Sequence, residues 1–158
     1  MGLFDWLKGG KTVYFPGKFT VEKAPEVYQN YIEILKILDI NFTSLSGLED
    51  FGMSLVHDGD LRSARDLANK NYKILKENFV NKIIVSSPED YRVLKEFYPK
   101  FIHDFKIKVE HISITIFEAL KDKEIKFKDL DEKREIVTYQ DSCYIGRLFG
   151  IYEEPRLV

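Results

Sequence analysis

The chain has 158 residues, of which 44% are hydrophobic and 32% are charged, which is typical of one globular domain and unlike a disordered or membrane-embedded chain. Its 24 basic and 26 acidic residues are interspersed, so the sequence offers no basic stripe for nucleic acid. The single cysteine excludes an internal disulfide and favours a cytoplasmic location, and no apolar run reaches the roughly 20 residues of a membrane span.

The first ten residues, MGLFDWLKGG, predict a short helix that ends at the two glycines. Leu3, Phe4 and Leu7 would form one apolar stripe on it. Such a stripe packs on its own domain or docks on a partner or a membrane surface, and the sequence leaves both possibilities open.

The rest of the chain alternates apolar, strand-like runs with segments of helical periodicity. Strands are predicted at residues 11–17, 40–46, 82–87, 106–113 and 134–142. Helices are predicted at residues 24–39, after an Asp60 cap, at residues 88–99 before a terminating Pro99, and at residues 114–123. This order predicts a single α/β domain, residues 1–158, with a mostly parallel five-stranded sheet in three layers, helices on both faces and a Rossmann-like arrangement.

Ligands of open parallel sheets collect outside the carboxyl ends of the strands. The residues that follow the predicted strands include Lys18, Asp50, Ser87, Asp90 and Cys143. The topology alone therefore predicts that these five side chains converge on one edge of the sheet.

Four segments carry a resemblance to a known family: VYFPGK, LEDFGMSLVHDGDLRSARDLANKNYKIL, IIVSSPEDYRVLKEFYP and VTYQDSCYIGRLFGIYEEPR. In order and spacing they resemble the cysteine-rich, Cys-Cys-Gly domain proteins. These include the cysteine-rich subunit of heterodisulfide reductase and the iron–sulfur subunits of glycolate, lactate and anaerobic glycerol-3-phosphate oxidation systems. The resemblance implies one Rossmann-like half of such a protein, with residues 134–158 opening the second half, and protein subunits of a redox complex as partners.

The resemblance also implies thiolate ligands that this chain lacks. Where the family has its first-motif cysteines, the sequence has Lys18, Asp50, Phe51, Ser87 and Asp90. Iron–sulfur clusters need soft thiolate ligands, which an ammonium group or a phenyl ring cannot replace. We therefore expect a degenerate cluster site, with neither an iron–sulfur cluster nor another metal bound by this chain alone.

The replacements suggest how the emptied crevice is filled. We expect Phe51 to occupy its volume and Lys18 to pair with Asp50 or Asp90 across the strand ends. Ser87, which precedes Pro88, is predicted to be the N-cap of the next helix, and that role competes with any catalytic one.

Cys143 falls on the cysteine that opens the family's second motif, and Asp141 and Arg147 match its neighbours. Cys143 is either a ligand or site residue in a site that another chain completes, or a small, partly buried side chain. No histidine lies beside it in the sequence, and activation as a nucleophile would need a base.

Arg147 is the candidate contact for an anion, because Gly146 and Gly150 would let a ligand or partner approach closely. A salt bridge to Glu153 or Asp141 explains the same arginine equally well.

The histidines give weaker signals. His57 with Asp58 and Asp60 could form a metal site, although these residue types in a glycine-containing loop more often make turns and caps. His103 and His111 have no partner spacing and receive no role.

Three functions fit these observations. The first is a cluster-free relative of an iron–sulfur oxidoreductase subunit, with a structural or docking role in a heterodisulfide reductase-like complex. The second is an electron-transfer subunit whose cluster is completed through Cys143 by a missing half or a partner chain. The third is small-molecule binding in the emptied crevice, where the absence of a phosphate-binding glycine motif argues against a nucleotide.

Overall fold

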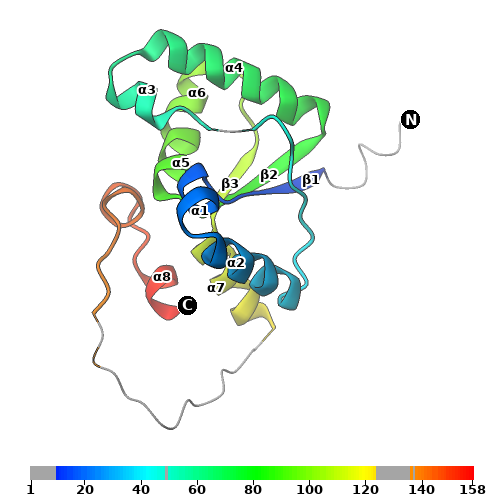
Figure 1. The fold of residues 1–158 in the computed structure, drawn as a ribbon, viewed down its shortest axis with the longest axis vertical. Coiled ribbons are helices and arrows are strands. Elements are labelled where there is room, and N and C mark those ends of the chain that lie inside the picture. Colours follow the sequence, from blue (N-terminus) through cyan, green and yellow to red (C-terminus); the bar gives the residue numbers. More distant parts are fainter. Residues whose placement is uncertain (1–9, 49, 124–135, 137) are drawn as a thin grey trace, which may run out of the picture.

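The computed structural model describes residues 10–48, 50–123, 136 and 138–158. A parallel sheet of three strands, β1 (Lys11–Phe15), β2 (Val80–Val85) and β3 (Lys108–His111), runs through its centre in the order β1-β2-β3 (Figure 1). The α/β class and the parallel sheet are thereby confirmed. The predicted N-terminal helix falls almost wholly on residues 1–9, outside the described residues.

The prediction of five strands is wrong for the described part of the chain. The 40–46 segment makes only one bridge, in which Thr43 exchanges backbone hydrogen bonds with Thr12 and Tyr14 of β1. It then leaves the strand direction, because Leu45 and Leu48 pack into the core beside the turn at Gly47. Of the predicted 134–142 strand, residues 134, 135 and 137 lie outside the described residues and the others are not in a strand.

Helices connect the strands and lie to either side of them (Figure 1). Those expected from the periodicity are α2 (Pro25–Ile37), α4 (Leu61–Glu77), α5 (Pro88–Arg92) and α7 (Ile112–Asp122). The predicted 88–99 helix continues from α5 through a π-helical turn η1 (Val93–Phe97) into α6 (Tyr98–Phe101). The segments not foreseen are α1 (Lys18–Lys23), α3 (Met53–His57), a second π-helical turn η2 (Cys143–Arg147) and α8 (Glu153–Leu157).

The alternation of side chains along the strands builds two hydrophobic clusters. Val13 and Phe15 of β1 and Ile83 of β2 contribute to one cluster, which includes residues of α4, α5, η1 and α6. Tyr14 and Ile84 contribute to the other, which includes residues of α2 and α7. Neighbouring strand residues point to opposite faces, so both faces of these two strands are covered. No helix in the described ranges has the length and apolar character to cross a bilayer.

Local capping signals in the sequence are confirmed. The Asp60 side chain accepts a hydrogen bond from the Ser63 amide at the start of α4. At the start of α5 the Ser87 Oγ accepts from the Asp90 amide at 3.2 Å. The prediction that Pro99 ends the helix is wrong. Since Pro99 has no amide hydrogen, the chain widens into η1, where the Tyr98 amide reaches back five residues to the Val93 carbonyl, and continues as α6.

We expect Ser87→Ala to lower the free energy of unfolding by about 1 kcal/mol, because the Asp90 amide loses its acceptor at the start of α5. Urea denaturation measures the change. Ser54→Ala is the matched control, since Ser54 is an exposed serine of α3 that caps no helix. Equal effects of the two substitutions would contradict a capping role.

Candidate functional site

A crevice opens beyond the carboxyl ends of β1 and β2. It has a volume of about 320 Å³, and its wall includes Lys18, Asp50, Ser87 and Asp90. Four of the five positions at which the family resemblance expects thiolates therefore border one cavity. The fifth, Phe51, lies in the hydrophobic core beside Phe15, whose side chain forms part of the crevice wall.

The crevice lies where the chain stops adding segments on one side of β1 and continues on the other side. From β1 the chain first crosses to one side, where Thr43 bridges to β1, and it then returns to place β2 on the other side. The connections thus diverge between β1 and β2, which is the position where open α/β sheets bind ligands.

Phe51 is packed as tightly as a core residue. Its ring is 1% exposed and makes edge-on contacts with Phe15 and Tyr98, at centroid distances of 4.6 and 5.9 Å. The buried Asn71 amide of α4 donates to the Asp50 carbonyl at 2.7 Å and to the Tyr98 hydroxyl at 3.0 Å. The first of these bonds fixes the backbone directly before the ring, at Asp50. Phe51 is therefore a core residue and does not close the crevice, so its filling of the volume of a lost cluster stays a prediction.

Asp90 places a carboxyl group at the bottom of the crevice. It is 8% exposed, and no cation forms an ion pair with it within the part of the chain that the structure describes. Burial, and then repulsion from Asp50, raise the pKa of the Asp90 carboxyl to about 7, against an opposing effect of the Ser87 hydroxyl. Gly17 (φ 82°), between β1 and α1, approaches closely: a Cβ there would lie 3.1 Å from the Asp90 Oδ2.

The predicted pairing of Lys18 with Asp50 or Asp90 is wrong. The Lys18 side chain is 67% exposed, and its Nζ lies 3.9 Å from Glu22 Oε1, one turn along α1. The sequence analysis treated Lys18 as a loop residue, whereas helix α1 directs it to the rim of the crevice. Asp50 instead accepts a hydrogen bond from the Gly52 amide at 2.5 Å.

Cys143 does not border the crevice that Asp50 and Asp90 line. It borders a second hollow of about 510 Å³ that shares Phe19, Thr20, Ser87 and Glu89 with the crevice. The thiol is exposed, which contradicts the partly buried alternative considered for it.

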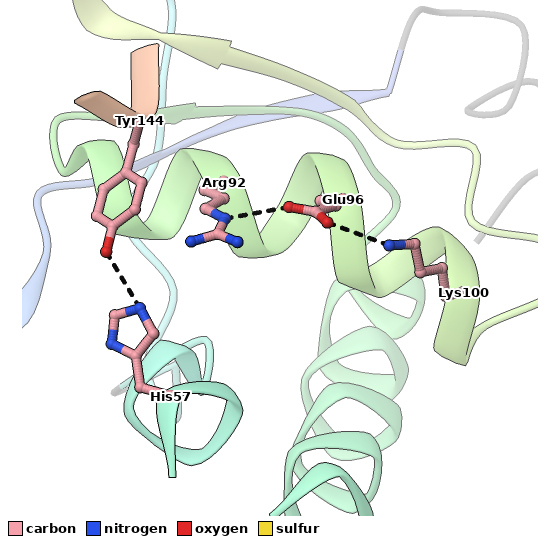
Figure 2. Close-up of polar contacts among 5 residues, drawn as sticks. All are labelled: His57, Arg92, Glu96, Lys100 and Tyr144. Atoms are coloured by element: carbon pink, nitrogen blue, oxygen red, sulfur yellow. Dashed lines mark hydrogen bonds and ion pairs between the residues drawn. The ribbon is translucent and has the colours of Figure 1, made fainter. Parts of the chain in front are cut away.

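Figure 2 shows how the turn that carries Cys143 is attached. The Tyr144 hydroxyl lies 3.1 Å from His57 Nε2 of α3, and the Arg92 guanidinium lies 5.1 Å from the centre of the Tyr144 ring. Arg92 is held by Glu96, which also accepts from Lys100, and these contacts lower the pKa of the Glu96 carboxyl. His57, considered above as a metal ligand, therefore contacts the Tyr144 side chain. No described group of three or more His, Cys, Asp or Glu side chains is arranged to hold a metal ion.

The expectations for Arg147 change in two ways. Arg156, and not Arg147, pairs with Asp141 and Glu153, while Arg147 is exposed and forms no ion pair within the described residues. Gly146 does not leave room for a ligand, because a Cβ there would lie 2.7 Å from Cε1 of the Tyr152 ring. Whether Arg147 binds an anion stays a prediction.

His111 was given no role from the sequence, yet it is buried at the end of β3 and caps α7. Its Nε2 lies 2.9 Å from the Ser86 carbonyl, which can only accept, so Nε2 carries the hydrogen. Its Nδ1 then accepts from the Ser113 amide. Burial lowers the pKa of His111 to about 4 against the effect of the Ser86 hydrogen bond. The sequence did carry a signal for this capping role, because His111 is a polar residue directly between a buried strand and a helical segment.

The donor groups around the crevice do not fit an iron–sulfur cluster. Asp50, Ser87 and Asp90 offer only oxygen atoms, Lys18 offers an ammonium group, and Phe51 is an apolar core residue. The one thiol of the chain, Cys143, borders the neighbouring hollow. Clusters need several thiolates, so these residues cannot hold one by themselves.

Comparison with known proteins supports the family resemblance at a coarse level. The chain is 29% identical over 153 residues to a subunit of the dihydromethanophenazine:CoB–CoM heterodisulfide reductase of Methanosarcina acetivorans, with 92% of this chain and 36% of that protein covered. It is 34% identical over 92 residues, 58% of this chain and 12% of the other, to the "Probable iron-sulfur-binding oxidoreductase FadF" of Bacillus subtilis. It is 29% identical to the EtfAB:quinone oxidoreductase of Syntrophomonas wolfei, with 87% and 19% of the two chains covered.

These three relatives are therefore a heterodisulfide reductase subunit, a probable iron–sulfur-binding oxidoreductase and a quinone oxidoreductase. The chain spans only 12% to 36% of the length of these three relatives. No family model and no solved structure matches it.

We expect Phe51→Ala to lower the free energy of unfolding by roughly 3 to 5 kcal/mol, because a cavity opens between Phe15 and Tyr98. Phe19→Ala is the control: Phe19 is 75% exposed, and its loss should change stability by less than about 0.5 kcal/mol. Urea denaturation of both variants tests the packing, and a loss below about 1 kcal/mol for Phe51→Ala would contradict it.

Asp90 and His111 should give opposite dependences of stability on pH. The Asp90 pKa is raised from 3.8 to about 7, so its stabilising contribution is present at low pH and is lost as the pH rises through 7. The His111 pKa is lowered from 6.5 to about 4, so its contribution is present above 6.5 and is lost as the pH falls through 4. The two effects oppose each other between pH 4 and 6.5.

Asp90→Asn should therefore make the protein more sensitive to acid than the unaltered chain. The free energy of unfolding of the variant should fall more steeply with decreasing pH, by at most about 1.4 kcal/mol per pH unit. Urea titrations at several values between about pH 4.5 and 8 measure this slope. Asp66→Asn, which removes the same charge from an exposed position of α4, should leave the slope unchanged. Identical slopes for the two variants would show that Asp90 ionises normally.

Proposed function

We propose that this chain is a cluster-free relative of iron–sulfur oxidoreductase subunits, with a structural or docking role in a redox complex. Phe51 supports this proposal most directly. The resemblance expects a thiolate where this ring stands, and the ring is instead built into the core against Phe15 and Tyr98. With this packing, the loop at Phe51 would need no cluster to hold it in place.

The partner proposed for this role is a protein subunit of a heterodisulfide reductase-like complex. Its support is that a relative aligned over 92% of the chain is itself named as a subunit of such a reductase. The single cysteine supports a location in the reducing cytoplasm.

Small-molecule binding in the crevice is a second candidate. It is favoured by the position of the crevice between β1 and β2 and by Lys18, which points away from the carboxylates that were expected to neutralise it. The two functions are compatible, because a docking subunit can also bind a ligand.

An electron-transfer role through Cys143 is a third candidate. The exposed thiol supports it, since a cluster shared with another chain would need a ligand accessible to that chain. In this case Cys143→Ser would abolish the cluster signal of the assembled complex.

Anaerobic purification of the full chain tests the main proposal. We expect a colourless, folded protein without bound iron or acid-labile sulfide, both before and after incubation with ferrous iron and sulfide under reducing conditions. Stoichiometric iron and sulfide in this preparation would overturn the proposal.

The docking role is tested by recovery of the tagged chain from its source cells and identification of the co-purifying proteins. Stoichiometric recovery of iron–sulfur oxidoreductase subunits is expected. The iron content of that complex, with and without Cys143→Ser, separates docking from a shared cluster, because docking alone leaves the iron content unchanged.

A further inference from the structure

The Asp90 carboxyl group is the one feature of the crevice that neither the core nor the capping of α5 explains. Its backbone amide serves the Ser87 cap, while its side chain is almost fully buried and borders the cavity. No cation pairs with it in the described part of the chain, and the Asp50 carboxylate lies close enough to raise its pKa. A buried carboxylate in this position is stabilised by a proton or by a cation that enters the cavity.

The charged groups that face Asp90 come from each element around the crevice. Helix α1 contributes Lys18, Glu22 and Lys23, the loop before α3 contributes Asp50, and α5 contributes Glu89. Asp90 and Asp50 also raise the pKa of the Tyr98 hydroxyl, after the larger effect of its burial. With Asp90 ionised, four carboxylates therefore oppose two ammonium groups along the wall of the cavity. Lys18 lies at the exposed rim beside Glu22, so the inner part of the crevice is anionic.

The remaining wall is apolar. Phe15 and Met53 border the cavity from β1 and α3, and Phe19 borders it from α1. A volume of about 320 Å³ accommodates a molecule of a few carbon atoms. A ligand that fits this surface combines a cationic head with a short hydrocarbon chain.

We propose that the crevice binds a small alkylammonium ion, with its ammonium group between Asp50 and Asp90 and its alkyl chain against Phe15 and Met53. This inference rests on the second candidate function given above, since it requires a crevice free of a cluster. An ammonium group supplies three N–H donors, which suits two carboxylates, and its pairing with a buried carboxylate is stronger than a neutral hydrogen bond.

The binding reaction involves a proton. Below about pH 7 the Asp90 carboxyl is protonated in the free protein, so the ammonium ion must displace that proton. The apparent affinity should then fall about tenfold for each pH unit below this value and be constant above it.

Isothermal titration calorimetry of the full chain with butylammonium chloride tests the proposal. Butan-1-ol and butanoate serve as matched probes, because they share the chain length and carry no charge or the opposite charge. We expect butylammonium to bind at about pH 8, to bind roughly tenfold more weakly at about pH 6, and to bind far more tightly than either control probe.

Two variants identify the residue responsible. Asp90→Asn should weaken butylammonium binding at about pH 8 by roughly tenfold or more, whereas Asp66→Asn, which has the same charge change outside the crevice, should leave it unchanged. Thermal unfolding shows that the variants are folded; Asp90→Asn should be at least as stable as the unaltered chain at this pH, because it removes a buried charge.

Absence of butylammonium binding, tighter binding of butanoate, or equal binding by the Asp90→Asn variant would each overturn the inference. Iron and sulfide are measured on the same preparation. A colourless, iron-free protein that fails to bind butylammonium refutes the alkylammonium site alone and leaves the docking role intact.

Discussion

The packing of Phe51 between Phe15 and Tyr98 is the constraint on which the arrangement of the crevice depends. The ring joins the end of β1 to α6, and the Asn71 amide holds the backbone beside it by bonding the Asp50 carbonyl. The described residues of the segment between Thr43 and α3 make one bridge to the sheet, so packing of Leu45, Leu48 and Phe51 in the core is what holds this segment. The position of Asp50 at the crevice is therefore a result of core packing.

Features that depend on a few neighbouring residues were predictable from the sequence. The caps at Asp60 and Ser87 need only a short polar side chain before a helical run, and β1 and β2 are recognisable as apolar segments. Thr43 could not be assigned correctly in the same way. Its segment has strand-like composition, and only the competing burial of Leu45 and Leu48 shows why pairing stops after one residue.

The candidate site was likewise predictable only in part. Its place at the carboxyl ends of the strands followed from topology, so the sequence was enough to predict that Asp50, Ser87 and Asp90 lie near one another. The orientation of Lys18 could not be predicted, because it depends on whether the residues after Gly17 form a loop or a helix. The cap that His111 forms at Ser113 is local, whereas the partner of its Nε2, the Ser86 carbonyl directly after β2, lies 25 residues away and could not be read from the sequence.

The fit of the Phe51 ring also bears on how such a chain evolves. Cysteine is much smaller than phenylalanine, so a single substitution that regained a thiol at this position would leave a void in a core that has only a modest margin of stability. Neighbouring side chains would have to enlarge first, before there was any cluster to favour the change. If the ancestor carried a thiolate here, as the resemblance implies, its replacement by phenylalanine was a step that selection could not easily retrace.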